Sequence, residues 1–410
     1  MLLLRHRDFL VILGAWGLSA LGDYLALVVL TLEVHRATGS GYAVAGLLVA
    51  AALPLIVVAP LAGWLVDRFE TRRVLALSAV FQAAVAMALA FCPPWAILAL
   101  TFLLGVGNAV DGPALFALIP RVVGDEHTGR ANGYLEAVKY VGLTLGPLLG
   151  GILAATAGTR PALLLDAGTF LVAAVAVLTL RARRHARALP AGESGEGARA
   201  GVGFLVRDRL LRLLIGVLGA TVVFAAMANV AEVFFAKDVL RAGDGGYGAL
   251  VAAWGIGMIG GAAVAAPRLR RAALPRGVLV AALLMGVGLA VPTLWLSLPV
   301  ALVAFALGGA ANGASNVAMR TLIHLRVPDP LRGRVFAAYF GISSAANLLA
   351  MALGGFVVEW LNARGSLLFT GVGAVVAALG GAVLLRRMPT AERESEVPDP
   401  YSRMPSPGAA

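Results

Sequence analysis

The chain has 410 residues, of which 60% are hydrophobic and only 13% charged, and its mean hydropathy is +0.88. A soluble domain of this length does not need so many apolar residues to form its core, so the composition predicts a protein that crosses a membrane many times. The formal net charge of +11 does not indicate a nucleic-acid-binding protein, because the arginines lie in short segments between apolar runs.

The sequence indicates neither an enzyme nor a metalloprotein. Cys92 is the only cysteine, which excludes a disulfide within the chain. No loop contains a nucleophile beside a base or a phosphate-binding motif, and the histidines do not have the spacing of metal ligands. We therefore expect no enzymatic activity, no metal and no bound cofactor. The five histidines are His6, His35, His127, His185 and His324.

Twelve apolar runs of about 18–25 residues can be marked, and each is long enough for one helical crossing of a hydrocarbon core about 30 Å thick. The first run follows Arg5 and Arg7 and is too long for the apolar core of a signal peptide, so we interpret it as a retained helix. The predicted fold is an all-α integral membrane protein with twelve transmembrane helices. The runs cover residues 9–32, 42–66, 74–91, 95–119, 133–155, 162–180, 211–236, 247–266, 277–297, 299–323, 335–359 and 366–385.

An internal repeat divides these helices into two pseudo-symmetric six-helix bundles. Five residues of the first half recur in the second half 204 residues later, and one shared offset is hard to obtain by chance. We predict an N-terminal bundle over 1–182, a flexible cytoplasmic linker over 183–209, a C-terminal bundle over 210–388 and a disordered tail over 389–410. The repeated residues are Asn108, Asp125, Arg130, Gly150 and Gly151, which return as Asn312, Asp329, Arg334, Gly354 and Gly355.

The distribution of lysine and arginine predicts the orientation in the membrane. If the N-terminus is cytoplasmic, the turns after the even-numbered helices and both ends of the chain lie inside and hold most of the basic residues. The outer turns hold only Arg36, Arg160, Lys237, Arg241 and Arg364. This bias predicts a multi-pass protein of a bacterial-type plasma membrane with both termini in the cytoplasm.

Residues 63–73, which we call the latch loop, join the second and third helices through the pattern Gly-x-x-x-Asp-Arg-x-x-x-Arg-Arg. The pattern resembles the loop between helices 2 and 3 of major facilitator superfamily transporters. The resemblance implies that Gly63 lets two helices approach and that Asp67 sits at the N-terminus of a neighbouring helix. It also implies that Arg68, Arg72 and Arg73 bond carbonyls and acids of the other bundle, which makes the loop a cytoplasmic gate. The alternative is a solvated turn that only fixes topology.

The fifth helix contains Gly142, Gly146, Pro147, Gly150 and Gly151. Glycines four residues apart line one face of a helix and let a neighbour approach to backbone contact, and the proline permits a kink. This pattern is similar to the helix-5 signature of the proton-driven exporters of the superfamily, which implies a close, leak-tight contact with the other bundle. The alternative is a packing face with no bearing on the direction of transport.

Ionisable residues inside a membrane are costly and are therefore functional candidates. Asp23, in the first helix, is a candidate proton-binding site or anchor for a cationic substrate; the alternative is a buried carboxyl bonded to polar helix groups. We expect Asp111 to be a partner of the latch arginines rather than a substrate ligand. Glu136 and Lys139, three residues apart, either neutralise each other or form a pair in one state only.

Two polar groups stand out in the second half. Asn229 and Glu232 lie three residues apart in the seventh helix and can face the same cavity, since the family resemblance implies that this helix lines one. Asn312, Asn316 and Arg320 form a polar stripe at four-residue spacing in the tenth helix. Such a stripe either binds substrate or holds helices together.

Within the superfamily, Leu21-Gly22-Asp23 and the region from Pro113 to Gly133 resemble the bacterial drug, macrolide and enterobactin exporters. The resemblance implies proton-coupled efflux of small amphipathic compounds (drug, antibiotic or siderophore-like) by alternating access, driven by the proton gradient. One departure is that the run from Leu98 to Val110 lacks the arginine that many proton-coupled drug exporters carry in helix 4. The alternatives are an uptake permease for a small polar or anionic solute and a non-transporting membrane sensor or scaffold.

The expected partners follow from this interpretation. They are a small-molecule substrate and the lipid bilayer, with no nucleic acid, and we expect the protein to act as a monomer. Proton entry from outside is expected to neutralise Asp23 and release the substrate, while the latch loop must open before the cavity faces inward.

Overall fold

The computed structural model of the chain describes residues 3, 6–181, 202–266 and 273–389. Within these residues every regular element is a helix, which confirms the predicted all-α membrane fold. Most of the predicted linker and nearly all of the predicted tail lie outside the described residues. The domain boundaries therefore remain predictions.

The first half contains eight α-helices and two short 3₁₀ turns. They are α1 (Arg7–Thr38), α2 (Gly41–Ala52), α3 (Pro54–Val57), α4 (Ala59–Arg68), α5 (Thr71–Phe91), η2 (Pro94–Ala96), α6 (Ile97–Val123), η3 (Asp125–His127), α7 (Thr128–Thr156) and α8 (Thr159–Leu178). The second half contains α10 (Arg209–Phe234), the π-helical turn η4 (Phe235–Val239), α11 (Gly243–Ala265), α12 (Leu274–Leu294), α13 (Leu298–Arg326) and α14 (Asp329–Arg387).

Ten of the described helices are long and apolar enough to cross a membrane, and the broken segment α2–α4 raises this number to eleven. The continuous second helix expected over 42–66 is not found, because Pro54 and Pro60 lack the N–H that a helix interior needs, and the segment bends by 49° before α4. The long helix α14 is interrupted at Asn362, whose φ of 56° and ψ of 175° are not helical. The predicted number of twelve is reached only if the stretches 329–361 and 363–387 are counted separately.

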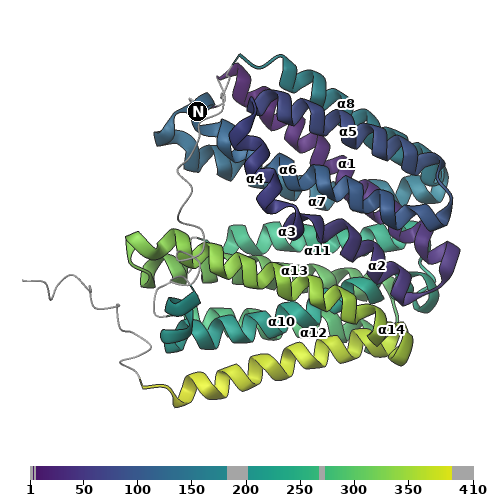
Figure 1. Cartoon of the computed structure of the whole chain (residues 1–410). Coiled ribbons are helices and arrows are strands. Elements are labelled where there is room, and N and C mark those ends of the chain that lie inside the picture. Colours follow the sequence, from purple (N-terminus) through teal and green to yellow (C-terminus); the bar gives the residue numbers. More distant parts are fainter. Residues whose placement is uncertain (1–2, 4–5, 182–201, 267–272, 390–410) are drawn as a thin grey trace, which may run out of the picture.

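The helices form two groups that follow the order of the chain. In Figure 1 the helices of residues 7–178 lie together in the upper part of the molecule, and those of residues 209–387 lie together below them. The N-terminus and the end of α14 lie at the same end of the molecule (Figure 1). This arrangement places a long interface between the two halves, with α1, α2 and α7 on one side and α10, α11 and α14 on the other.

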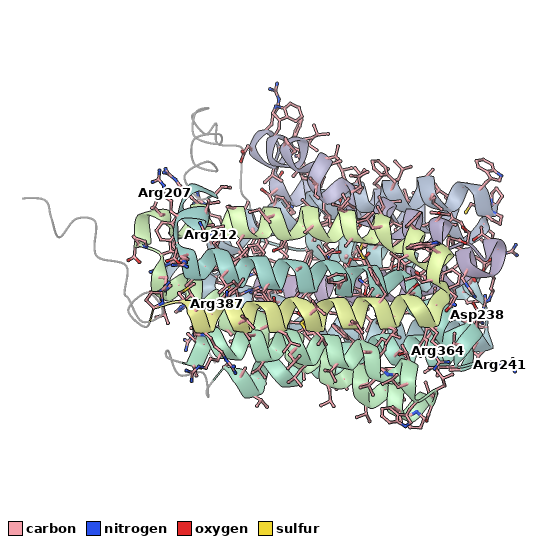
Figure 2. The ribbon with its side chains drawn as sticks, turned by 90° about the horizontal axis from the view of Figure 1, so that it is seen from below. Arg207, Arg212, Asp238, Arg241, Arg364 and Arg387 are labelled. Carbon is pink, nitrogen blue, oxygen red and sulfur yellow. The ribbon has the colours of Figure 1, made fainter. Side chains whose placement is uncertain are left out.

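The interface runs between two distinct ends of the molecule. At one end, which we call the latch end, the carboxylate of Asp8 accepts a hydrogen bond from the backbone N–H of Arg181 at 2.8 Å, so the start of α1 lies beside the end of α8. The opposite end, which we call the far end, holds the end of α1, the start of α2, η4 and the start of α11. Figure 2 shows Arg207, Arg212 and Arg387 at one end, and Asp238, Arg241 and Arg364 at the other.

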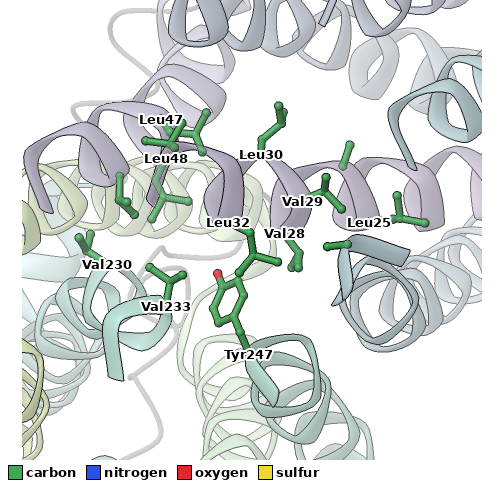
Figure 3. Packing of buried hydrophobic residues seen from close by; sticks show 14 of the residues in the cluster. Leu25, Val28, Val29, Leu30, Leu32, Leu47, Leu48, Val230, Val233 and Tyr247 are labelled. Atoms are coloured by element: carbon green, nitrogen blue, oxygen red, sulfur yellow. The ribbon is translucent and has the colours of Figure 1, made fainter. Parts of the chain in front are cut away.

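A dry cluster of aliphatic side chains joins the two halves toward the far end. Side chains of α1 and α2 lie beside those of α10 and α11, and most of them are less than 5% exposed. Because lipid is as apolar as these side chains, the cluster is held by close packing rather than by the removal of apolar surface from water. Figure 3 labels Leu25, Val28, Val29, Leu30, Leu32, Leu47, Leu48, Val230, Val233 and Tyr247.

Candidate functional site

A central cavity of about 520 Å³ lies between the halves, on the latch side of this cluster. It is walled by α1, α2, α3 and α6 of the first half and by the 344–351 stretch of α14 from the second half. Most of its lining is aliphatic, and the polar exceptions are Asp23, Tyr24, Thr101, Asn108, Ser344 and Asn347. A cavity of this size with few polar groups has the character of a small-molecule site.

Asp23 is the only acidic side chain in the lining of this cavity. Asn108 of α6 lies within hydrogen-bonding reach of its carboxyl, and the charge of Lys139 on α7 acts on it. Its Oδ1 atom is buried and has no hydrogen-bond partner. A carboxylate in the wall of an apolar cavity can bind either a proton or a cationic group.

A second buried acid that the sequence analysis did not single out lies directly behind Asp23. Asp166 of α8 is 0% exposed, and neither of its carboxyl oxygens has a hydrogen-bond partner. Its Oδ1 lies so close to Gly22 that a Cβ there would come within 2.3 Å of it. The signal was present in the sequence, since Asp166 is a single acid inside an apolar run, like Asp23.

Asp111 occupies a different environment from the one expected. Its Oδ2 accepts a hydrogen bond of 2.7 Å from Gln82 of α5, and its Oδ1 is buried. In the part of the chain that the structure describes, no ion pair joins it to Arg68, Arg72 or Arg73. Asp111 therefore belongs to the interior of the first half, where its charge also acts on Asp23.

Glu136 and Lys139 of α7 do not pair with each other in the described structure. Lys139 acts on Asp23, whereas the charge of Glu136 acts on Tyr24 and Tyr140. Both side chains thus influence the polar groups beside the central cavity rather than neutralising each other locally.

The polar stripe of α13 faces a separate cavity of about 350 Å³ between α7, α11 and α13, which Asn316 and Arg320 line. Asn316 donates a hydrogen bond of 3.1 Å to Asn312, whose own amide lies 3.9 Å from the sulfur of Met258. The guanidinium of Arg320 stacks over the ring of Phe340 at 5.3 Å. The stripe is therefore partly engaged in contacts between and along helices.

Asn229 and Glu232, expected to face a cavity from the seventh helix, are absent from the linings of both cavities. Glu232 is 8% exposed and is buried in α10, where its charge acts on Tyr247 of α11.

The arginines of the latch loop make their interactions within the first half. Arg72 donates hydrogen bonds to the carbonyl oxygens of Leu178 and Leu180 at the end of α8, at 3.3 and 2.9 Å. Arg73 pairs with Glu70 at 3.0 Å, and Arg68 stacks over Trp64 at 5.5 Å. The loop makes the hydrogen bonds to carbonyl oxygens that the resemblance implies, but these oxygens belong to the first half, like the loop itself. Gly63 and Asp67 lie in the last two turns of α4. The expectation that Gly63 lets two helices approach is wrong for this structure, because a Cβ there would meet nothing within 4 Å.

The helix-5 glycines contact two different helices. A Cβ at Gly142, Gly146 or Gly150 would come within 3 Å of the backbone of α1, in the same half. By contrast, a Cβ at Gly151 would lie 2.8 Å from the carbonyl oxygen of Asp244, and one at Gly248 would lie 2.4 Å from that of Pro147. Among the glycines of the motif, only Gly151 therefore approaches the other half this closely.

Ion pairs at the far end also join the two halves, and the sequence analysis did not foresee them. Arg36 of α1 and Lys237 of η4 both bind the carboxylate of Asp244, and His35 lies 3.4 Å from Asp238. On the other side of the interface, Glu359 of α14 accepts a hydrogen bond from the backbone N–H of Gly41 at 2.7 Å, which caps the start of α2. The far end is thus closed by polar bonds as well as by packing.

Comparison with known proteins identifies the architecture. Residues 3–410 match the major facilitator family described as transmembrane secretion effector. The chain is 27% identical over 401 residues to the uncharacterised MFS-type transporter YfiS of Bacillus subtilis (strain 168), with 93% of each chain covered. It is also 27% identical over 371 residues to the multidrug efflux pump Tap of Mycolicibacterium fortuitum, with 86% of this chain and 89% of the pump covered.

A solved structure has the same fold. It is a bacterial homologue of the human lysosomal transporter Spinster, with a TM-score of 0.72 and 18% sequence identity, and the alignment covers 93% of this chain and 97% of the homologue. These similar proteins are transporters, which confirms the prediction that the chain is not an enzyme.

Proposed function

The chain belongs to the transmembrane secretion effector family of the major facilitator superfamily, and we propose that it exports small amphipathic cations in exchange for protons. The single observation that carries this proposal is the central cavity, whose aliphatic lining contains one acid, Asp23. Aliphatic walls accept the apolar body of such a compound, and a carboxylate in the wall binds its positive charge. The similarity to a pump named for multidrug efflux favours export.

The proposed cycle is alternating access. We take the latch end as cytoplasmic, because basic residues such as Arg72, Arg207 and Arg387 gather there. The bonds of Asp244 and Glu359 close the far end in this structure, so the central cavity belongs to a state that is shut toward the outside. Both termini are then cytoplasmic, in a bacterial-type plasma membrane.

The proton and the cation compete for one carboxyl in this scheme. A compound entering from the cytoplasm binds ionised Asp23, the far end opens, and a proton from outside neutralises the carboxyl so that the compound leaves. The protonated carrier returns and releases the proton inside. The cycle needs only the proton gradient and no other cofactor, and we propose that one chain is enough, since α1, α6 and α14 of the same chain wall the cavity.

An uptake permease for an anionic solute is less well supported. Such a site needs a cation in the cavity, and Arg320 lines the separate cavity instead, where it stacks on Phe340. A membrane sensor or scaffold that transports nothing does not need a cavity walled by both halves with an acid in its apolar lining, so this alternative does not explain the cavity.

Ethidium, a flat aromatic cation, is a suitable probe for this proposal. Cells that express the protein and are preloaded with ethidium should lose it faster than control cells, and a proton uncoupler or the substitution Asp23→Asn should abolish the difference. Faster accumulation of ethidium, or efflux that the uncoupler leaves unchanged, would remove the proposal. The exposed acid Glu126, substituted by Gln, is a matched control.

A further inference from the structure

Asp166 is an acid for which the proposed cycle has no role so far. It lies in the middle of α8, is 0% exposed and has no hydrogen-bond partner at either carboxyl oxygen. It does not line the central cavity. An ionised carboxylate with no partner is very costly in such a place, and the usual remedy is that the group takes up a proton.

Gly22 brings this acid into contact with α1, one residue away from Asp23. A Cβ at Gly22 would lie 2.3 Å from Oδ1 of Asp166 and 2.6 Å from the hydroxyl oxygen of Thr169. The absence of a side chain at Gly22 is therefore what allows the carboxyl of α8 to approach the backbone of α1. The charges of Asp23 and Asp166 act on each other as a consequence.

The charged and titratable groups around this pair make the two acids unequal. From α1, only Asp23 acts on Asp166. On α5, Ser78 and Gln82 are the nearby polar groups; neither titrates, and both are directed at Asp111. From α7 and α6, Lys139 and Asn108 act on Asp23 and support its negative charge, whereas the charge of Asp111, also on α6, opposes it. Asp23 therefore has a counter-charge, whereas the one donor that acts on Asp166 is the hydroxyl group of Thr169 on the same helix, and no cation is among the groups that act on it.

We propose that Asp166 is a second proton-binding carboxyl of this transporter and that it exchanges its proton with the cavity through Asp23. Two neighbouring carboxylates that share no cation cannot both be ionised in a dry interior. In this scheme the proton resides on Asp166 while Asp23 is ionised and binds a cation. The inference rests on the proposed proton coupling.

The transfer is a simple proton exchange. The O–H bond of protonated Asp23 breaks, an O–H bond forms on the carboxylate of Asp166, and Asp23 is left ionised. No electron transfer and no co-reactant are involved. Because Asp23 lines the cavity and Asp166 is 0% exposed, the proposed route of a proton to the second acid runs through the first. A cycle that loads both acids moves two protons.

Infrared difference spectroscopy of the purified full-length protein tests the site without any substrate. A protonated carboxylic acid has a carbonyl-stretch band that an ionised carboxylate lacks. The wild-type protein at neutral pH should show this band. Asp166→Asn should lose the component that belongs to Asp166 while the component of other buried acids such as Glu232 remains, and Asp23→Asn should keep both components. In the wild type the band should disappear as the pH is raised, and the midpoint of its disappearance should change in Asp23→Asn, because that substitution removes the neighbouring charge.

Two outcomes would overturn the inference. The band could be the same in Asp166→Asn as in the wild type, or it could persist unchanged over the whole pH range, as expected of an acid that never exchanges its proton. If Asp166→Asn fails to fold, Gly22→Ala gives the same information, since its methyl group must displace the carboxyl and so shift the band. The control is Gly14→Ala on the same helix, where a Cβ meets nothing within 4 Å and the band should not move.

The two proposals fail separately. If ethidium efflux depends on Asp23 and on the proton gradient while the spectrum is insensitive to Asp166→Asn, the proposed function stands and the second proton site falls. If the band depends on Asp166 but efflux is insensitive to the uncoupler, the proposed proton coupling is wrong. Asp166 would then bind a proton without taking part in transport.

Discussion

Arg36, near the end of α1, and Asp244, in the first turn of α11, form an ion pair that joins the two halves at the far end. Asp244 is 8% exposed and also binds Lys237, so its single carboxylate holds two cations. Substituting Asp244 would remove the one carboxylate that Arg36 and Lys237 share and leave both partly exposed cations at the interface without it. Closure of the far end should therefore depend strongly on Asp244.

We predict that Asp244→Asn shifts the population toward the state that is open at the far end. A cysteine at position 27, introduced as Leu27→Cys with the native cysteine replaced by Cys92→Ser, would report from the wall of the central cavity. Its labelling by a membrane-impermeant thiol reagent added outside should rise about tenfold, which corresponds to about 1.4 kcal/mol.

The matched control is Asp329→Asn, since Asp329 is an exposed acid in a local ion pair with Arg332. Equal labelling rates in the wild type and Asp244→Asn would show that this ion pair does not hold the far end closed.

We also predict that Gly248→Ala opposes closure of the far end. Its methyl group would lie 2.4 Å from the carbonyl oxygen of Pro147 and 2.9 Å from Cα of Gly151, both backbone atoms of α7 that cannot move aside alone. Overpacking of this kind typically costs about 1–3 kcal/mol. The same labelling assay should show faster reaction, whereas Gly245→Ala on the same helix, where a Cβ meets nothing within 4 Å, should leave the rate unchanged.

Arg72 should contribute more to stability than its neighbour Arg73. Arg72 donates to two carbonyls at the end of α8, whereas Arg73 makes one ion pair from a side chain that is 77% exposed. Arg72→Ala should lower the free energy of unfolding by about 1–2 kcal/mol, and Arg73→Ala by less than about 0.5 kcal/mol. Thermal unfolding in detergent measures both, and a larger loss in Arg73→Ala would contradict the assignment.

The role of the latch loop in transport has its own test. Asp67→Asn removes the negative charge at the end of α4 while keeping the shape of the side chain. If the loop gates the cytoplasmic side, this variant should reach the membrane at the wild-type level but export ethidium several-fold more slowly. Normal export would leave the loop as a turn that only fixes topology.

The fold could be predicted from the sequence because each crossing needs a long apolar run, and such runs are visible without tertiary information. The break in the second crossing could have been foreseen from Pro54 and Pro60, but the direction of the bend depends on packing against α6. Asn362 falls in the predicted turn between the last two helices, where its positive φ is tolerated by a short polar side chain.

The site was only partly predictable. Asp23 could be found because an acid in an apolar run is costly, and the same criterion would have found Asp166. The bond between Arg36 and Asp244 could not be found, because its partners are 208 residues apart and meet only when the halves pack. For Asp111, charge and sequence position pointed to the latch arginines, whereas the structure places Gln82 within hydrogen-bonding distance on the adjacent helix.

Proton-driven transport by purified protein tests the central proposal most directly. Proteoliposomes that contain the protein would be given a pH gradient with the membrane potential clamped at zero, and ethidium uptake would be followed by fluorescence. We predict uptake that collapses when the gradient is dissipated, that is absent in Asp23→Asn and that is normal in Glu126→Gln. Equal uptake by the wild type and Asp23→Asn, or uptake that is indifferent to the gradient, would contradict the account.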